Sequence, residues 1–422
     1  MTSTQSLGQP ARPSDDDDVV RRTQVLDLVR AMPAGVLVPL ETSVLLTIAI
    51  TQFDAAGWVK GLIAAASGVG LLLSPFITEA ARRTRIPAMR VAAIISLIGA
   101  VGFALAAIGP IGMLVIGAII GIAAITASIP LSSATYDSNF PAADRGKRVG
   151  RGMTVRVAAG ALTGLAMGSY LKANPNQWWH LALVGTVAMS AVAWAQHRFP
   201  SQPIPPVDGR HPSSLPHFHL LGEDRQLRLT LIAWMFMGFG NLMLLPLRVE
   251  FLARPRYGIN ADAAEIILLT VTVPSIVRLA CMPLFGRLFD RMSFFSARIM
   301  VNLCFAVYVA AFFSSTGRIG LLFGAVAFGV GSAGGDLMWT LWVTKFAPPG
   351  RVADYMGLHT FFTGIRAVSA PLLGFVVIER FDLTTVASMA AALIVISSLM
   401  LLPEARSARR ARPSSHDLTV KP

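Results

Sequence analysis

The chain consists largely of apolar segments, each long enough to cross a membrane. Runs of about 20 apolar residues, the helix length that spans the hydrocarbon core of a bilayer, recur along almost the whole sequence. Only 14% of the residues are charged, whereas soluble domains average about a quarter. The short alternating segments typical of a membrane β-barrel are not evident. We therefore predict an all-α integral membrane protein.

Polar and basic loops divide these apolar segments into twelve predicted transmembrane helices. Six fall in residues 27–198 and six in residues 227–404, and the proline-rich polar stretch 199–226 is expected to be a cytoplasmic linker between the two halves. The expected spans are 28–52, 58–78, two that flank Gly109-Pro110 and end near Asp137, one that contains Arg156, one that follows Trp179 and ends at Arg198, and then 228–249, 262–285, 295–315, 319–345, 355–378 and 383–403.

The basic residues indicate which loops face the cytoplasm. Lys and Arg concentrate in loops 82–90, 144–151 and 286–298 and in the basic tail 405–422, whereas the opposite loops are short and hold fewer, such as Lys60. The positive-inside rule then places both termini in the cytoplasm. Because topology accounts for the net charge of +13, we expect no nucleic-acid partner.

The N-terminal segment is polar rather than apolar. Residues 1–26 include the acidic run Asp15–Asp18, so we expect a disordered cytoplasmic tail and no signal peptide. Short loops suit the cytoplasmic (inner) membrane of a bacterium, and we expect a monomer in contact with the lipid bilayer.

The two halves resemble each other at an offset of about 210 residues, as expected for a transporter with internal repeats and a binding site between them. The corresponding sets, which have identical internal spacing, are Asp144, Arg156, Gly164 and Asp354, Arg366, Gly374.

The segment Gly286-Arg-Leu-Phe-Asp290-Arg291 resembles the signature Gly-x-x-x-Asp-Arg loop of the major facilitator superfamily. With its two six-span halves, the chain resembles a secondary transporter of this superfamily over essentially its whole length. The resemblance implies a twelve-helix fold in two pseudo-symmetric halves.

The signature loop also implies gating residues. In the first half it is degraded, with Glu79 in place of the aspartate and Arg83 among the basic residues that follow. In the family this loop is thought to latch helices on the cytoplasmic side. Asp290, Arg291, Glu79 and Arg83 are therefore gating candidates, and the alternative is that they only set topology.

One departure from the family bears on substrate. Drug–proton antiporters of the superfamily usually carry a Gly-Pro dipeptide in a glycine-rich fifth helix, whereas residues 159–168 here contain no proline. This weakens the case for multidrug exchange.

Ionisable residues inside the spans follow the cavity pattern that the fold implies. Helices 3, 6, 9 and 12 would face lipid, and their apolar cores contain no Asp, Glu, Lys or Arg. Lipid-facing charge is costly, so this distribution indicates a polar central pathway. Five charged residues inside the spans, Glu41, Arg156, Arg278, Asp336 and Arg366, all fall on predicted cavity helices.

Arg278 and Arg366 are the candidate substrate ligands, because a guanidinium suits a carboxylate or phosphate. The alternative is structural pairing, of Arg366 with Asp336 or of Arg278 with Glu41. Asn241, Trp339 and Trp342 are expected to shape the pocket, although such residues more often only pack.

Glu41 and Asp336 are the candidate proton carriers. Glu41 is preferred because no cation lies within one helical turn of it in the sequence. Arg156 lies nearer the cytoplasmic end and is expected to act as a gate. His359 is expected to form an interhelical hydrogen bond.

The chain is predicted to be a secondary active transporter that moves a small polar or anionic metabolite by alternating access, with protons as the expected coupling ion. One alternative is proton-driven efflux of amphipathic compounds, and another is a transporter-like receptor or lipid-handling protein. The sequence has no Walker loop and no nucleophile–base pattern, so neither ATP-driven transport nor an enzyme is expected. No cofactor or metal is expected, because His211, His217 and His219 lack accompanying ligands.

Overall fold

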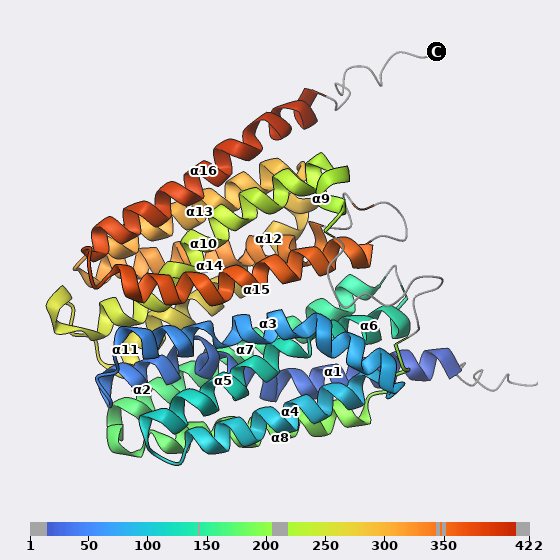
Figure 1. Cartoon of the computed structure of the whole chain (residues 1–422), viewed down its shortest axis with the longest axis horizontal. Helices are drawn as coiled ribbons and strands as arrows, with labels where there is room; N and C mark the ends of the chain where they lie inside the picture. Colours follow the sequence, from blue (N-terminus) through green and yellow to red (C-terminus); the bar gives the residue numbers. More distant parts are fainter. Residues whose placement is uncertain (1–14, 142–143, 205–217, 343–346, 348–351, 411–422) are drawn as a thin grey trace, which may run out of the picture.

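The protein is a bundle of long helices that lie side by side (Figure 1). The computed structural model describes residues 15–141, 144–204, 218–342, 347 and 352–410, with side chains described for all of these except 15–16, 290, 340–341, 352–354 and 408–410. In these ranges no strand forms, apart from an isolated bridge between Pro87 and Pro203. The prediction of an all-α fold is confirmed.

The first half comprises the helices up to residue 198. They are α1 (Asp15–Pro39), the π-helical turn η1 (Leu40–Val44), α2 (Leu45–Thr51), α3 (Gly57–Thr84), α4 (Ala88–Ala106), α5 (Ile111–Ala127), α6 (Ile129–Asn139), α7 (Arg145–Ala173), the 3₁₀ turn η2 (Pro175–Gln177) and α8 (Trp179–Arg198).

The second half repeats this plan. Its elements are α9 (Leu220–Glu223), α10 (Arg225–Ala253), the 3₁₀ turn η3 (Pro255–Tyr257), α11 (Ala263–Ile267), the π-helical turn η4 (Leu268–Thr272), α12 (Val273–Arg291), α13 (Phe294–Phe313), α14 (Arg318–Leu341), α15 (Val352–Val377) and α16 (Leu383–Arg410).

These elements form twelve membrane helices, because α1–η1–α2, α5–α6 and α11–η4–α12 are each one continuous membrane helix. Among the described residues, eleven of these helices are long and apolar enough to span a membrane. The twelfth is α7, whose first turns carry several basic residues but which packs lengthwise against α1. The twelve-helix prediction therefore holds.

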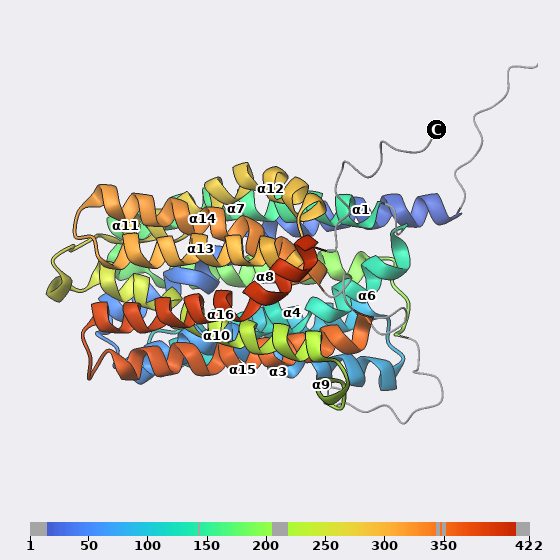
Figure 2. The same cartoon turned by 90° about the horizontal axis from the view of Figure 1, so that it is seen from above.

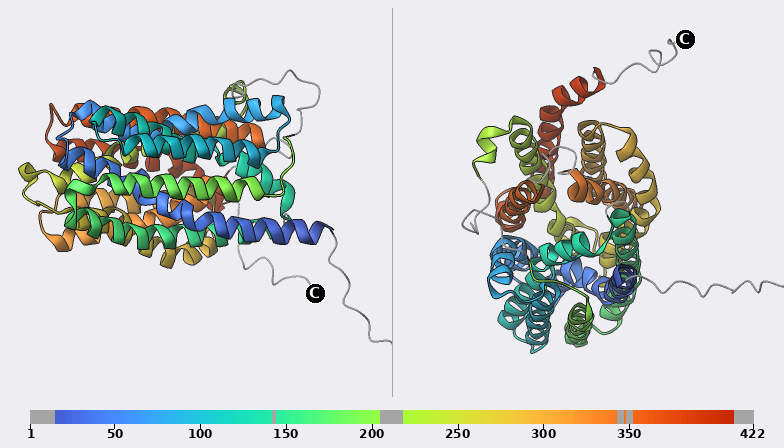
Figure 3. Two further views of the ribbon diagram at one scale, coloured as in Figure 1. Left: turned by 90° about the horizontal axis from the view of Figure 1, so that it is seen from below. Right: turned by 90° about the vertical axis from the view of Figure 1, so that its right-hand side faces the viewer.

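We name the two ends of the bundle by their position relative to the linker between the halves. The linker end holds the start of α1, the start of α10 and the end of α16, on the right of Figure 1, and the opposite end is the distal end. The first half lies below and the second half above in that view, and Figure 3 shows them as two groups when seen from the linker end.

Both terminal helices extend past their predicted boundaries. α1 begins at Asp15, so residues 15–26 are helical rather than disordered, and Figure 2 shows this part projecting beyond the bundle. α16 continues to Arg410, past the predicted end at residue 404. Acidic residues in the first turn and basic residues in the last both oppose the helix dipole, which favours these extensions.

Four helices, α4, α8, α13 and α16, pack chiefly within their own half. Their outward faces expose large apolar side chains, such as Val101, Val187 and Leu399, as expected for the outer helices of the fold. One prediction here is wrong. Arg298, assigned to a cytoplasmic loop, lies inside α13 and is buried, because it turns inward onto Trp234.

Candidate functional site

Glu41 lies where the first membrane helix widens. Pro39 lacks an N–H and its ring clashes with the preceding turn, and the chain continues as the π-helical turn η1. Such turns are frequent at functional sites. Glu41 Oε2 lies 3.8 Å from Arg156 Nη2 on α7, and the two side chains are 17% and 38% exposed. They are therefore a loose pair, open to solvent.

Arg156 reaches Glu41 because α1 and α7 approach closely. A Cβ on Gly35 would lie 2.5 Å from both the Arg156 carbonyl oxygen and the Ala159 Cβ, so only glycine fits there. The reason given from the sequence for preferring Glu41 as a proton carrier, that no cation lies near it, is therefore wrong. No cation is near it in sequence, but one is near it in space.

The second half holds a matching ion pair. Arg278 on α12 pairs with Asp336 on α14, and their side chains are 24% and 31% exposed. The two helices are held close at Gly329, where a Cβ would lie 2.7 Å from the Pro274 carbonyl oxygen. The structural pairings considered from the sequence, Arg366 with Asp336 and Arg278 with Glu41, do not occur.

The two pairs form one cluster across the halves, which we call the central cluster: Glu41, Arg156, Arg278 and Asp336. α7, which carries Arg156, packs across the interface against η4 and α12, which carries Arg278, and this brings Arg156 near the second pair. At 1.5 Å per residue, Glu41 lies about 15 Å from the distal end of its membrane helix at Thr51, and Asp336 about 27 Å from the start of α14. The cluster thus lies between the middle of the bundle and the linker end.

Arg366 lies elsewhere, inside the second half. Its Nη1 donates to the Trp234 carbonyl oxygen at 2.5 Å and its Nη2 to the Thr363 hydroxyl at 3.2 Å, and the residue is buried. The face of α15 that meets the first half carries Ala367 instead, which abuts Gly68. Arg366 therefore faces α10 and is not part of the central cluster.

Aromatic residues and a second arginine surround Arg366. The Arg298 guanidinium lies 4.4 Å from the Trp234 ring centroid, and His359 packs edge-on against the same ring. His359 is buried, and its Nε2 has no hydrogen-bond partner among the described residues, so the expected interhelical bond from that atom is not found.

The three residues expected to shape the pocket differ in how deeply they are buried. Trp342 is fully buried between Trp234 and Phe294, so it lines no open cavity here. Trp339 is half-buried beside His359, and Asn241 is half-buried on α10. Only the last two retain exposed surface.

The gating candidates lie at the linker end. Glu79 is buried and accepts from Arg82 at 2.6 Å and from Arg83 at 2.8 Å, all within the last turns of α3. Arg291 is exposed at the end of α12. The side chain of Asp290 lies outside the described residues.

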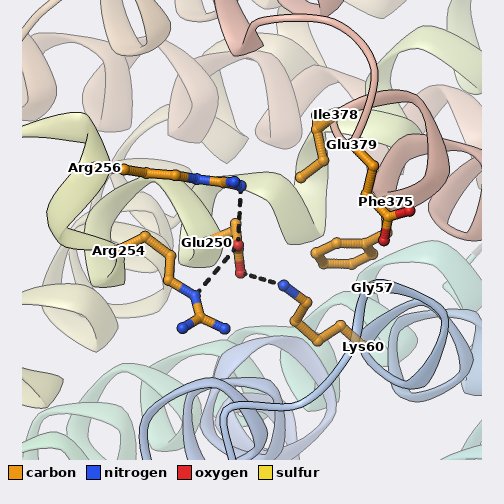
Figure 4. A pocket seen from close by; sticks show the side chains of 8 residues that line it. All are labelled: Gly57, Lys60, Glu250, Arg254, Arg256, Phe375, Ile378 and Glu379. Atoms are coloured by element: carbon orange, nitrogen blue, oxygen red, sulfur yellow. Dashed lines mark hydrogen bonds and ion pairs between the residues drawn. The ribbon is translucent and has the colours of Figure 1, made fainter.

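A charged cavity of about 250 Å³ lies at the distal end, between α3, α10 and α15 (Figure 4). Lys60 Nζ lies 2.9 Å from Glu250 Oε2, and Arg254 and Arg256 approach the other carboxylate oxygen at 3.4 Å and 3.3 Å. The side chains of Lys60 and Glu250 are only 7% and 2% exposed. Lys60, predicted as a loop cation, is therefore a buried link between the halves.

Two further ion pairs join the halves at this end. Asp54 pairs with Arg254, and Lys172 lies 2.9 Å from Asp262. The Arg254 guanidinium, which donates a hydrogen bond to the carboxylate, holds the pKa of Asp54 below its usual value. Among the described residues, every ion pair between the halves is at the distal end.

The halves also touch at mid-bundle. Ser43 of η1 donates to Thr270 of η4 at 2.9 Å, so the two π-helical turns meet across the interface. A Cβ on Gly68 would lie 2.6 Å from the Ala367 carbonyl carbon, so α3 and α15 are in backbone contact there. The interface is therefore closed from mid-bundle to the distal end.

No group of three or more possible metal ligands occurs among the described residues. His211 and His217 lie outside the described residues.

Sequence reasoning did not single out Glu250, Arg248 or Arg298. Glu250 carried a usable signal, since it lies in a largely apolar segment that continues to Ala253 and precedes Arg254 by one helical turn. Arg248 lies near the end of the expected span 228–249 and is fully buried, with its guanidinium 4.1 Å from the Phe328 ring centroid.

The family model described as Major Facilitator Superfamily matches residues 28–365. The chain belongs to the Major Facilitator Superfamily. As a member, it is a multi-pass membrane transporter of small molecules rather than an enzyme. No curated protein sequence matches it.

Solved structures of transporters share the superfamily fold. A mutant of the nucleoside transporter NupG superposes with a TM-score of 0.71 at 13% identity, covering 91% of this chain and 99% of that one. The xylose transporter XylE from E. coli gives 0.67 at 14% identity, covering 91% and 96%. The human organic anion transporter MFSD10 gives 0.64 at 15% identity, covering 92% and 100%.

Proposed function

We propose that this superfamily member moves a small polar or anionic solute by alternating access, coupled to protons, in a bacterial cytoplasmic membrane with the linker end inside. The observation that carries the proposal is the central cluster, in which each half contributes one arginine and one carboxylate. A solute held between Arg156 and Arg278 would contact both halves, which is the requirement for a site that alternates.

The chemistry of the cluster favours an anionic or hydroxyl-rich solute. Each arginine offers a planar fork of donors that fits a carboxylate or phosphate. Such a group would compete with Glu41 for Arg156 and with Asp336 for Arg278. The two guanidiniums, one on each half, thus bind the solute, and the two carboxylates compete with the solute for them.

The same competition supports proton coupling. A carboxylate displaced from its arginine inside the bundle is costly to leave charged and unpaired. Taking up a proton removes that cost, so solute binding and protonation of Glu41 or Asp336 would favour each other. Release of the solute restores the ion pair and expels the proton.

Efflux of amphipathic compounds has less support. It would need a broad apolar wall, and of the two tryptophans expected to shape the pocket, Trp342 is fully buried and only Trp339 keeps exposed surface. The relatives named above carry a nucleoside, a sugar and organic anions, which are polar solutes or anions.

A thermal-shift screen of the purified chain against anionic, neutral and cationic metabolites tests the proposal. A ligand at 100 times its Kd stabilises the folded state by about 2.7 kcal/mol. We expect an anionic or hydroxyl-rich class to stabilise the protein, and the effect to disappear in Arg278→Ala but persist in Arg287→Ala, an exposed arginine of the same helix. Stabilisation by lipophilic cations that is lost in Asp336→Asn would support efflux instead.

A further inference from the structure

A second cavity, of about 360 Å³, opens on the outer surface of the first half at the linker end. We call it the basic groove. It lies between the first turns of α1 and the last turn of α8, which pack against each other. The lining residues are Arg21, Arg22, Val25, Leu26, Trp194 and Arg198.

Two of the three arginines in the basic groove have no anionic partner in the described part of the chain. Arg21 pairs with Asp18 at 3.1 Å on the exposed face of α1. Neither Arg22 nor Arg198 pairs with a carboxylate among the described residues, and the Arg198 guanidinium lies 5.2 Å from the Trp194 ring centroid. The groove therefore presents two uncompensated guanidiniums beside an indole.

An apolar stripe leads away from the groove. On α1, the exposed side chains of Val25, Val29 and Met32 follow one another at one-turn spacing along one face. On α8, exposed Trp194 and Val187 lie two turns apart. Large apolar side chains exposed in this way on the outer surface of the bundle face lipid chains, so the groove lies at the end of a lipid-facing surface.

The depth of the groove fits the headgroup layer. From Thr51 back to Val25 the first membrane helix is about 39 Å long at 1.5 Å per residue, whereas the hydrocarbon core is about 30 Å thick and the bilayer with headgroups about 40–45 Å. With Thr51 in the headgroup layer of the distal side, Val25 and Leu26 lie in the headgroup layer of the linker side, with Arg22 one turn further out.

We propose that the basic groove binds an anionic phospholipid. Arg22 and Arg198 contact its phosphate oxygens, and an acyl chain lies along Val25, Val29 and Met32. Basic pockets between membrane helices on the cytoplasmic side bind anionic headgroups by this combination of charge and apolar contact. The site is distinct from the central cluster and does not depend on what the chain transports.

The occupant is a lipid rather than a soluble phosphate because charge and apolar surface are continuous. A free phosphate would use only the arginines and leave the stripe unexplained. Since α1 and α8 belong to the same half, the lipid can stay bound whichever end of the transporter is open.

Fluorescence quenching by brominated lipids tests the proposal on the full chain. Purified protein is titrated with dibrominated phosphatidylglycerol or with dibrominated phosphatidylcholine, and the quenching due to Trp194 is taken as the difference from Trp194→Phe. We expect the anionic lipid to quench Trp194 at lower concentration. Each arginine near the membrane surface is worth about fivefold in affinity, so Arg22→Gln with Arg198→Gln should weaken binding roughly 25-fold.

The matched control is Arg90→Gln with Arg151→Gln, which removes two exposed arginines of the same half outside the groove. It should keep the preference for the anionic lipid. Equal quenching of Trp194 by the two lipids, or equal loss in both double variants, would overturn the proposal. Full competition by inorganic phosphate would identify a soluble-anion site and overturn it as well.

Discussion

Lys60 of α3 and Glu250 of α10 form a buried ion pair, 2.9 Å from Nζ to Oε2, that ties the two halves together at the distal end. The partners are not equivalent. Arg254 and Arg256 contact the other oxygen of Glu250 from within its own half, so Glu250 stays paired when the halves separate. Among the described residues Lys60 forms no second ion pair, and the carboxylate of its own half that interacts with it, Asp54, is exposed, so Lys60 must become hydrated. When this end opens to water, Glu250 keeps its arginines and Lys60 is hydrated, so neither charge is left unpaired. We call the Lys60–Glu250 pair the latch.

Neutralising the two residues of the latch should open the distal end to different extents. Glu250→Gln should open the distal end more than Lys60→Gln, because it leaves Lys60, Arg254 and Arg256 facing one another. Removing one partner of a buried pair typically costs about 3–5 kcal/mol. Distances between spin labels on Ile108→Cys and Ile319→Cys, exposed positions on opposite halves at the distal end, would report the opening.

Lys172→Gln serves as the control for the latch. Its pair with Asp262 is exposed, and such pairs contribute about 1 kcal/mol or less, so the label distances should barely change. Equal distance distributions in Glu250→Gln and Lys172→Gln would contradict the latch.

Glu41→Gln is expected to separate proton coupling from solute movement. The amide cannot cycle a proton but still leaves Arg156 near a hydrogen-bond acceptor. In proteoliposomes, uptake driven by a pH gradient should fall about tenfold or more, whereas exchange of solute across the membrane without a gradient should persist. Equal loss of both activities would mean that Glu41 acts in binding or folding rather than in coupling.

Arg366→Ala should act on stability rather than on solute affinity. Arg366 supplies the donor to the buried Trp234 carbonyl, and leaving a buried polar group without a partner costs about 1–3 kcal/mol. The melting temperature in detergent should fall relative to Arg228→Ala, which removes an exposed arginine. A variant with unchanged melting temperature and no solute-induced stabilisation would instead return Arg366 to the binding site.

Gly68→Leu is predicted to force the halves apart at mid-bundle. The first added carbon would already lie 2.6 Å from the Ala367 backbone and 2.7 Å from the Val368 nitrogen, where nothing flexible can yield. Thermal stability should drop, and transport with it. Gly150→Leu, where a Cβ meets no atom within 4 Å, is the matched control and should behave like the unmodified chain.

The helical class, the twelve spans and the family followed from the sequence because bilayer thickness and backbone hydrogen bonding leave few alternatives. The partners of charged residues did not follow. Glu41 and Arg156 are 115 positions apart, and only the close approach of α1 and α7 at Gly35 brings them together. Lys60 looked like a loop cation because its partner, Glu250, lies in the other half.

The position of Arg366 could not be predicted from the sequence for a different reason. Its repeat equivalent, Arg156, was expected to act as a gate but lies in the central cluster, whereas Arg366, expected to bind substrate, does not. The two sides of α15 have different neighbours, and the turn of the helix directs Arg366 towards Trp234. Sequence spacing gives the face of a helix but not which neighbour that face meets.

The most direct test of the account is the accessibility of the central cluster from each side of the membrane. A single cysteine at Arg156→Cys, with Cys281 and Cys304 replaced by alanine, is reacted with a membrane-impermeant maleimide in oriented vesicles. We predict labelling from the linker side only, and added labelling from the distal side once Glu250→Gln opens the latch. Labelling of the parent from the distal side, or from neither side, would contradict the account.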